Sequence, residues 1–197
     1  MKTYISENSQ THKVDPRIFQ TEIIIKDPLP SFINLPKVIN SIETILPELY
    51  FTGIDSIYIG KFKKLEDNET NAMFFKGMMY IDNEQDNDKD LIDDIIHEVA
   101  HNLEIIANDE IYANNEIIKE FLAKRRRLFN ILIANGFSPP ENFEMELKWD
   151  EEIDKFLYKE VTYDIIRKIA SGLFVTPYGA TSLREYFANG FESYYLG

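Results

Sequence analysis

The sequence predicts a single α+β domain, with a small, mostly antiparallel sheet that precedes a long amphipathic helix. Short apolar runs typical of strands lie in the first half of the chain, and patterns of helical period dominate from residue 90 onward. The chain has 197 residues, of which 44% are hydrophobic. This is enough apolar material for one core, so we expect one domain over residues 1–197.

The first elements follow from apolar runs and prolines. Residues 1–20 are polar and show no periodic pattern, so we expect an N-terminal arm in which His12 is a solvated bystander. The run Ile23 to Ile25 predicts a short strand that stops at Asp27-Pro28, because proline cannot donate to a strand ladder. From Pro36 to Leu46 the apolar residues recur with helical period, which predicts a helix.

The next segment has the pattern of a strand followed by a hairpin. Residues 54–60 predict a strand, and the charged residues 61–70 predict a loop. Two apolar runs follow, at 72–75 and 78–81, and only Lys76-Gly77 separates them. Two residues is the length of a tight hairpin turn, so we expect these runs to pair as antiparallel strands.

The helix expected from Asp90 to Ala107 carries the motif H-E-x-x-H as His97, Glu98 and His101. Residues four apart lie on one helix face one turn from each other, so both imidazoles can bind the same ion. Buried imidazoles and a carboxylate are costly to desolvate without a partner, and Zn²⁺ is a partner that prefers these ligands. The alternative is that all three residues lie on the solvated side of an amphipathic helix.

Helical patterns also fill the second half. Residues 110–135 predict a long helix that ends at Gly136, and residues 141–171 predict one or two further helices. The basic run KRRR at 124–127 predicts a solvated helix face rather than a nucleic-acid site, because consecutive charges point around the helix circumference. The last helix starts near Ser182 and carries Glu185.

Composition excludes several classes of function. The chain has no cysteine, which excludes disulfides, thiolate metal sites and cysteine nucleophiles. The net charge of −13 argues against binding to nucleic acid or to an anionic membrane. The sequence has no signal-peptide core and no run long enough for a membrane helix. We therefore expect a cytoplasmic protein, unless another route delivers it outside the cell, and nothing predicts its oligomeric state.

A catalytic zinc needs a third protein ligand besides the two histidines. Glu104 and Ala107 stand where a metzincin would have glycine and histidine, so that class is excluded. An acid on a separate helix is the remaining common solution, and Glu185 is the first candidate, with Glu104 and Glu192 next. Ser182 and Glu185 also form a capping-box pattern, so Glu185 could instead close the helix N-terminus.

The segment from Tyr178 to Tyr195 resembles the C-terminal helix of lethal factor-like and Pro-Pro endopeptidase-like zinc metallopeptidases. That family pairs H-E-x-x-H with a tyrosine seven residues before a glutamate, and the glutamate opens a motif like E-F-F-A-E-x-F. The resemblance implies a zincin-like fold and a zinc endopeptidase acting on a peptide or protein substrate. It further implies that His97, His101 and Glu185 bind Zn²⁺, that Glu98 is the catalytic base, and that Tyr178 assists at the oxyanion.

The chain departs from the family pattern in two ways. Glu185 lies 84 positions after His101, which predicts a helical insertion over residues 108–171. Asn189 stands at the second acid of the motif, and an amide can orient a ligand imidazole but adds no charge. This second departure favours a rival interpretation, a zincin-fold binding or structural protein with weak or no turnover, whereas the intact Glu98 and Tyr178 favour the enzyme.

Overall fold

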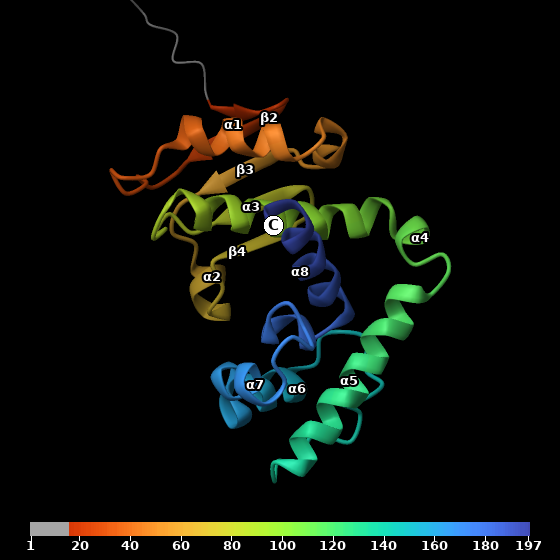
Figure 1. The fold of residues 1–197 in the computed structure, drawn as a ribbon. Helices are drawn as coiled ribbons and strands as arrows, with labels where there is room; N and C mark the ends of the chain where they lie inside the picture. The colour runs from red at the N-terminus through yellow and green to blue at the C-terminus, as the bar shows by residue number, and fades with distance from the viewer. Residues whose placement is uncertain (1–15) are drawn as a thin grey trace, which may run out of the picture.

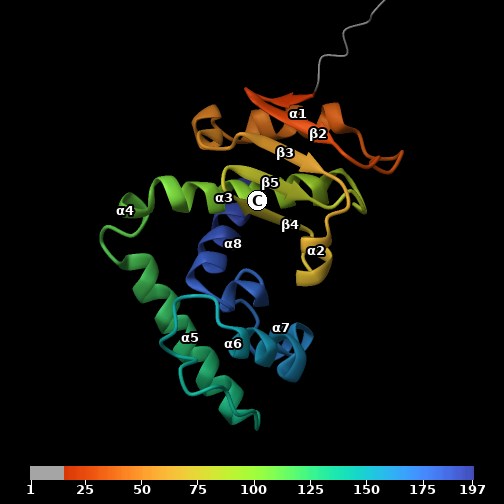
Figure 2. The ribbon, with the colours of Figure 1, turned by 180° about the vertical axis from the view of Figure 1, so that it is seen from behind.

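The computed structural model describes residues 16–197 and has an α+β fold (Figures 1 and 2). Within these residues, a five-stranded mixed sheet is combined with eight α-helices. Most of the arm predicted at residues 1–20, including His12, lies outside the described residues. Its last part belongs to the sheet, because β1 (Arg17–Ile18) pairs with β2 (Thr21–Ile25) and Ile18 is fully buried.

The remaining strands are β3 (Ser56–Ile59), β4 (Ala72–Phe75) and β5 (Met78–Ile81), and the strand order is β1-β2-β3-β5-β4. The pairs β1–β2 and β4–β5 are antiparallel, whereas β2–β3 and β3–β5 are parallel. The expectation of a mostly antiparallel sheet is therefore wrong. Helix α1 (Leu35–Ile45) crosses over between β2 and β3 and returns the chain in the parallel direction, and residues 60–77 do the same between β3 and β5.

The predicted hairpin is confirmed, with Phe75 paired to Met78 across the turn Lys76-Gly77. Both turn residues have positive φ, 52° at Lys76 and 78° at Gly77, which suits a two-residue hairpin. A Cβ at Gly77 would lie only 2.6 Å from Asp55 Oδ2, so glycine is required here. The hairpin places β4 at one end of the sheet.

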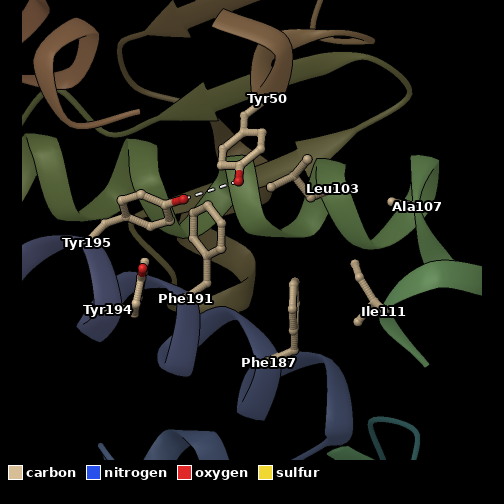
Figure 3. A pocket seen from close by; sticks show the side chains of 8 residues that line it. All are labelled: Tyr50, Leu103, Ala107, Ile111, Phe187, Phe191, Tyr194 and Tyr195. Atoms are coloured by element: carbon tan, nitrogen blue, oxygen red, sulfur yellow. Dashed lines mark hydrogen bonds between the residues drawn. The ribbon is translucent and has the colours of Figure 1, made fainter. Parts of the chain in front are cut away.

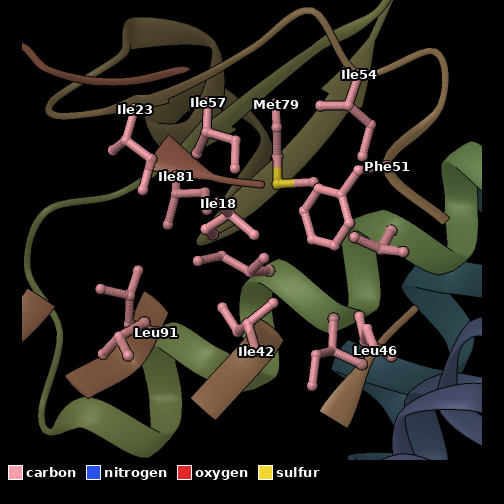
Figure 4. Packing of buried hydrophobic residues seen from close by; sticks show 14 of the residues in the cluster. Ile18, Ile23, Ile42, Leu46, Phe51, Ile54, Ile57, Met79, Ile81 and Leu91 are labelled. Atoms are coloured by element: carbon pink, nitrogen blue, oxygen red, sulfur yellow. The ribbon is translucent and has the colours of Figure 1, made fainter. Parts of the chain in front are cut away.

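Helices α1 and α3 (Asp88–Ile106) cover one face of the sheet, and the main apolar core lies between these layers (Figure 4). Alternate residues of each central strand point into this core, as the period of a strand requires. Helix α3 begins where the Asn87 side chain accepts the N–H groups of Lys89 and Asp90. The loop predicted at residues 61–70 instead contains a short helix, α2 (Lys63–Asn68), anchored by the buried Leu65.

The second half forms a separate helical layer around its own apolar cluster (Figure 1). The helix predicted at residues 110–135 is divided into α4 (Asn108–Ile111) and α5 (Glu116–Ala134). The cluster is completed by the following elements: α6 (Glu151–Lys155), a π-helical turn η2 (Phe156–Val161), α7 (Tyr163–Ile169), a 3₁₀ turn η3 (Pro177–Ala180) and the start of α8 (Leu183–Leu196). One more 3₁₀ turn, η1 (Glu48–Phe51), precedes β3 in the first half.

The prediction that the basic run at 124–127 is a solvated face is wrong for one residue. Arg126 and Arg127 are exposed, but Arg125 is fully buried. Its Nε donates to the carbonyl oxygen of Phe143 at 2.8 Å and its Nη1 donates to that of Ala180 at 2.6 Å. A helix with a period of 3.6 turns one of four consecutive residues inward, and here backbone carbonyls satisfy the inward guanidinium.

Among residues 16–197, every helix is too short or too polar to span a lipid bilayer.

Candidate metal centre

Helices α3 and α8 pack side by side and bring the predicted ligands together (Figure 1). Nε2 of His97 lies 3.1 Å from Glu185 Oε2, and Nε2 of His101 lies 3.5 Å from Glu185 Oε1. All three side chains are nearly buried. One carboxylate therefore faces both imidazoles, from a residue that lies 84 positions after His101 and 88 after His97.

Glu185 takes part in the N-terminal cap of α8 through its backbone N–H and not through its carboxylate. The N–H of Glu185 donates to Ser182 Oγ at 3.2 Å, so Ser182 is the N-cap of α8. The Glu185 carboxylate points away from the cap and toward the histidines. The backbone of Glu185 therefore belongs to the helix cap, and the cap fixes the direction in which the Glu185 carboxylate points.

The other two ligand candidates lie elsewhere. Glu104 accepts a hydrogen bond from the Tyr112 hydroxyl at 2.7 Å, on the outer side of His101. Glu192 lies 3.3 Å from Nδ1 of His97, which is the ring nitrogen on the far side from Glu185. Of the three candidates, Glu185 is the one with a carboxylate oxygen within 3.5 Å of Nε2 of each histidine.

The charges within this group are strongly coupled. Burial alone opposes protonation of His97, but hydrogen bonds to Glu185 and Glu192 outweigh it and raise the pKa of His97 to about 10. Burial lowers the pKa of His101. Burial also penalises the Glu185 carboxylate, but its hydrogen bonds with the two histidines hold its pKa well below its usual range. The Glu185 carboxylate therefore favours the protonated form of His97.

Glu98 lies between the two histidines in sequence and is also buried, with 4% of its surface exposed. Its Oε2 atom has no hydrogen-bond partner among residues 16–197, which is costly for a buried carboxylate oxygen. Burial raises the pKa of Glu98 to about 7. A carboxylate with a pKa near neutrality and an unused oxygen in a cleft has the properties of a general base.

The group opens into a cleft of about 720 Å³. Residues 69–74, which include part of the edge strand β4, form one wall, and aromatic side chains from the helical layer form the other. Tyr178 belongs to this second wall and comes from η3, the turn just before α8. Burial, then the charge of Glu185, raise the pKa of Tyr178 above its usual range, so its hydroxyl stays protonated and can donate.

Sequence reasoning missed several residues of the cleft. Asp94 lies in the cleft, accepts a hydrogen bond from Gln85 at 3.0 Å, and has a pKa that burial raises to about 6. Its position four residues before Glu98 was the available signal, because it places both on one helix face. Arg184, beside Glu185 in sequence, also lines the cleft, and its Nε donates to Nδ1 of His101 at 3.0 Å. The segment after α5 contributes the rest of the aromatic wall with Trp149, Tyr158 and Tyr163.

The donor set fits zinc. Ligand atoms of His97, Glu98 and His101 lie within 4.8 Å of one another. Two ligand atoms bound tetrahedrally to one zinc ion lie roughly 3.4 Å apart, given bonds of about 2.0–2.2 Å. The observed separations of 3.1 and 3.5 Å between Glu185 and the imidazoles match this value. Two imidazoles and two carboxylates are therefore gathered where they could hold a metal ion.

A second pocket lies between the C-terminal parts of the same two helices (Figure 3). It has a volume of about 370 Å³ and is lined by aromatic and aliphatic side chains from η1, α3 and α8 and by Ile111 of α4. Its polar groups are tyrosine hydroxyls, of which Tyr195 donates to Tyr50 at 3.1 Å. Such a lining packs the helices together and offers no metal ligand.

No protein-family model matches the chain, and searches of curated proteins and of solved structures found no match. The site is therefore assigned a function from its own geometry.

Proposed function

We propose that this protein is a zinc-dependent endopeptidase. His97, His101 and Glu185 hold the zinc ion, Glu98 is the general base, and Tyr178 is a hydrogen-bond donor to the substrate. The observation that carries the proposal is the position of the Glu185 carboxylate, which faces the Nε2 atoms of both histidines at 3.1 and 3.5 Å. The lethal factor-like resemblance predicts the same set of residues.

Zinc bound by two imidazoles and a carboxylate polarises a carbonyl oxygen and lowers the pKa of a water ligand. The chain supplies the remaining chemistry. Glu98, with its pKa raised to about 7, takes a proton from the attacking water and delivers it to the amine that leaves. The water oxygen bonds to the carbonyl carbon, the C–N bond breaks, and a carboxylic acid and an amine result.

Tyr178 is suited to stabilise the oxygen that becomes negative during this addition. Its hydroxyl is protonated, and its side chain remains 38% exposed on the cleft wall. A donor aimed at a developing oxyanion contributes more to the rate than to substrate binding. We therefore assign Tyr178 to transition-state stabilisation.

The edge strand supports an extended peptide as substrate. β4 ends the sheet, so its outer hydrogen-bonding groups face away from β5. Residues 69–74 line the cleft beside the H-E-x-x-H helix. An extended peptide that pairs with such an edge places its backbone carbonyls in a regular row, and one of them would lie at the metal site.

The test compares wild type with Glu98→Gln, using an unbiased peptide library in the presence of one equivalent of zinc. The amide keeps the size of the side chain but cannot accept the proton. We expect unchanged zinc content and a fall in cleavage rate of about 100-fold or more. Glu141→Gln, an exposed acid in the loop after α5, is the charge-matched control and should cleave like wild type.

If zinc-loaded wild type cleaves no peptide in the library, the endopeptidase proposal fails. In that case the rival interpretation, a metal-binding protein that holds a partner without hydrolysing it, takes its place. Equal rates for wild type and Glu98→Gln would leave metal binding intact and remove Glu98 as the base.

A further inference from the structure

Outer-sphere contacts to the two histidines are unequal, although both histidines face Glu185 in the same way. The Nδ1 atom of His97 lies 3.3 Å from a carboxylate oxygen of Glu192. The Nδ1 atom of His101 lies 3.0 Å from the Nε of Arg184, which is a donor. Nδ1 of His97 therefore faces a hydrogen-bond acceptor, whereas Nδ1 of His101 faces a hydrogen-bond donor.

This difference matters when Nε2 of each histidine binds a metal ion. A neutral imidazole that binds through Nε2 carries its proton on Nδ1 and needs an acceptor there. Glu192 is such an acceptor for His97. Arg184 cannot be an acceptor for His101, because its Nε–H and an Nδ1–H of His101 would be two donors that face each other.

We propose that Glu192 is the positioning residue of His97, the outer-sphere acid that fixes its Nδ1–H tautomer and its ring orientation for metal binding. This inference rests on the proposed metal site. Glu192 lies seven residues after Glu185, two helical turns along α8, so both carboxylates lie on the helix face toward α3.

Asn189, which stands at the second acid position of the family motif, has a different role. It is buried, and its Oδ1 accepts a hydrogen bond from the Thr176 hydroxyl. A Cβ at Gly179 would be 3.4 Å from Asn189 Oδ1, so the turn that carries Tyr178 packs directly on this amide. Asn189 therefore fixes the Tyr178 turn, and the space around it is taken by that turn.

The experiment measures zinc affinity by competition with a chromogenic chelator at pH 7.5, for wild type, Glu192→Gln and Glu192→Ala. Loss of an outer-sphere partner typically weakens metal binding by about 10- to 100-fold. We expect a loss in this range for Glu192→Ala and a smaller loss for Glu192→Gln, since an amide oxygen can still accept from Nδ1. Glu152→Gln, an exposed acid on α6, removes the same charge away from the site and should bind zinc like wild type.

A spectroscopic readout separates positioning from general destabilisation. In ¹⁵N-labelled, zinc-loaded protein, the His97 Nδ1 proton should give a hydrogen-bonded, downfield signal that moves upfield or exchanges rapidly in Glu192→Ala. The double variant Asn189→Glu with Glu192→Gln should not recover wild-type affinity, because position 189 faces the Tyr178 turn. Recovery would overturn the proposal.

Affinities of both Glu192 variants within twofold of wild type would also overturn it. The same titration on His97→Ala distinguishes this failure from failure of the site. If His97→Ala loses zinc while the Glu192 variants keep it, the metal site stands and only the role of Glu192 is wrong. If His97→Ala binds zinc like wild type, the proposed function is wrong as well.

Discussion

The guanidinium of Arg125 donates a hydrogen bond of 2.6 Å to the carbonyl oxygen of Ala180, two residues after Tyr178. Arg125 comes from α5, within residues 108–171, which the sequence analysis predicts as a helical insertion. The segment is therefore joined to the turn that carries the proposed oxyanion donor. Phe143, whose carbonyl also accepts from Arg125, packs its ring against the same guanidinium at 4.2 Å.

We predict that Arg125→Met unfolds at lower urea concentration than wild type, with a loss of about 3 kcal/mol or more. The variant leaves buried carbonyl oxygens without a donor, and hydrogen bonds to charged groups are worth about 1.5–3 kcal/mol each. Arg126→Met is the matched control on the exposed side of the same helix, where the loss should stay within about 0.5 kcal/mol. Equal losses for the two variants would show that burial of Arg125 has no energetic consequence.

Zinc-dependent stability tests Glu185 as a ligand. Zinc at 1,000 times its dissociation constant stabilises the folded state by about 4 kcal/mol. We expect the melting temperature of wild type to rise on moving from chelator to zinc, and that of Glu185→Gln to rise much less. The variant should also melt lower in chelator, because protonated His97 loses its ion pair with Glu185, so the zinc-induced rise is the informative quantity. The same rise in both proteins would mean that Glu185 is not a ligand.

Tyr178→Phe should lower kcat by about 100-fold with little change in KM or zinc content, since an oxyanion donor acts mainly in the transition state. Tyr163→Phe is the matched control. Its ring lies 6.4 Å from that of Tyr178 in the same cleft, but it has no role in the proposed chemistry. A loss confined to KM in Tyr178→Phe would assign the hydroxyl to substrate binding instead.

The raised pKa of Asp94 predicts how the stability of the folded protein changes with pH. Its folded-state pKa, about 6, is higher than the usual value of 3.8, because burial disfavours its charge. The folded state therefore holds a proton more tightly than the unfolded state, and this group destabilises the protein as pH rises from about 4 to above 6. The cost at pH 7.5 is at most about 3 kcal/mol.

Asp94→Asn should accordingly be more stable than wild type at pH 7.5 and similar to it at pH 4, measured by thermal melting in chelator. The amide oxygen can still accept the hydrogen bond from Gln85. Glu141→Gln should show no such pH-dependent gain. A stabilisation of Asp94→Asn that is the same at both pH values would contradict a raised pKa.

Local patterns predicted those elements whose residues have a single strong period. The Lys76-Gly77 turn fixed the β4–β5 pairing, and the apolar face of residues 90–107 predicted α3 within two residues at its start and one at its end. The direction of pairing between β2 and β3 could not be read from the strands, since both directions bury the same alternate residues. It depends on how α1 packs, which is a tertiary property.

The candidate ligand residues, which the structure brings together, could be predicted because the chemistry of zinc restricts its ligands to a few residue types. Asp94 and Arg184 could not be predicted, because they are ordinary helix-surface residues until a second helix packs nearby, and Glu192 was predicted only as an alternative ligand. Arg125 is a similar case. Its burial follows from the carbonyls of two loops that meet it only in the folded chain.

Helix α8 is shared between the two apolar clusters. Leu183 and Tyr186, in its first turns, pack with the helical layer, whereas Phe191 and Tyr195, in its last turns, pack with the sheet layer. Local opening of either cluster would therefore release one end of the helix that holds Glu185. Amide protons of α8 should therefore exchange at least as fast as those of α3, and protease nicking in either half should abolish metal binding. The ion would link two cooperative folding units, so occupancy of the site reports that both are intact.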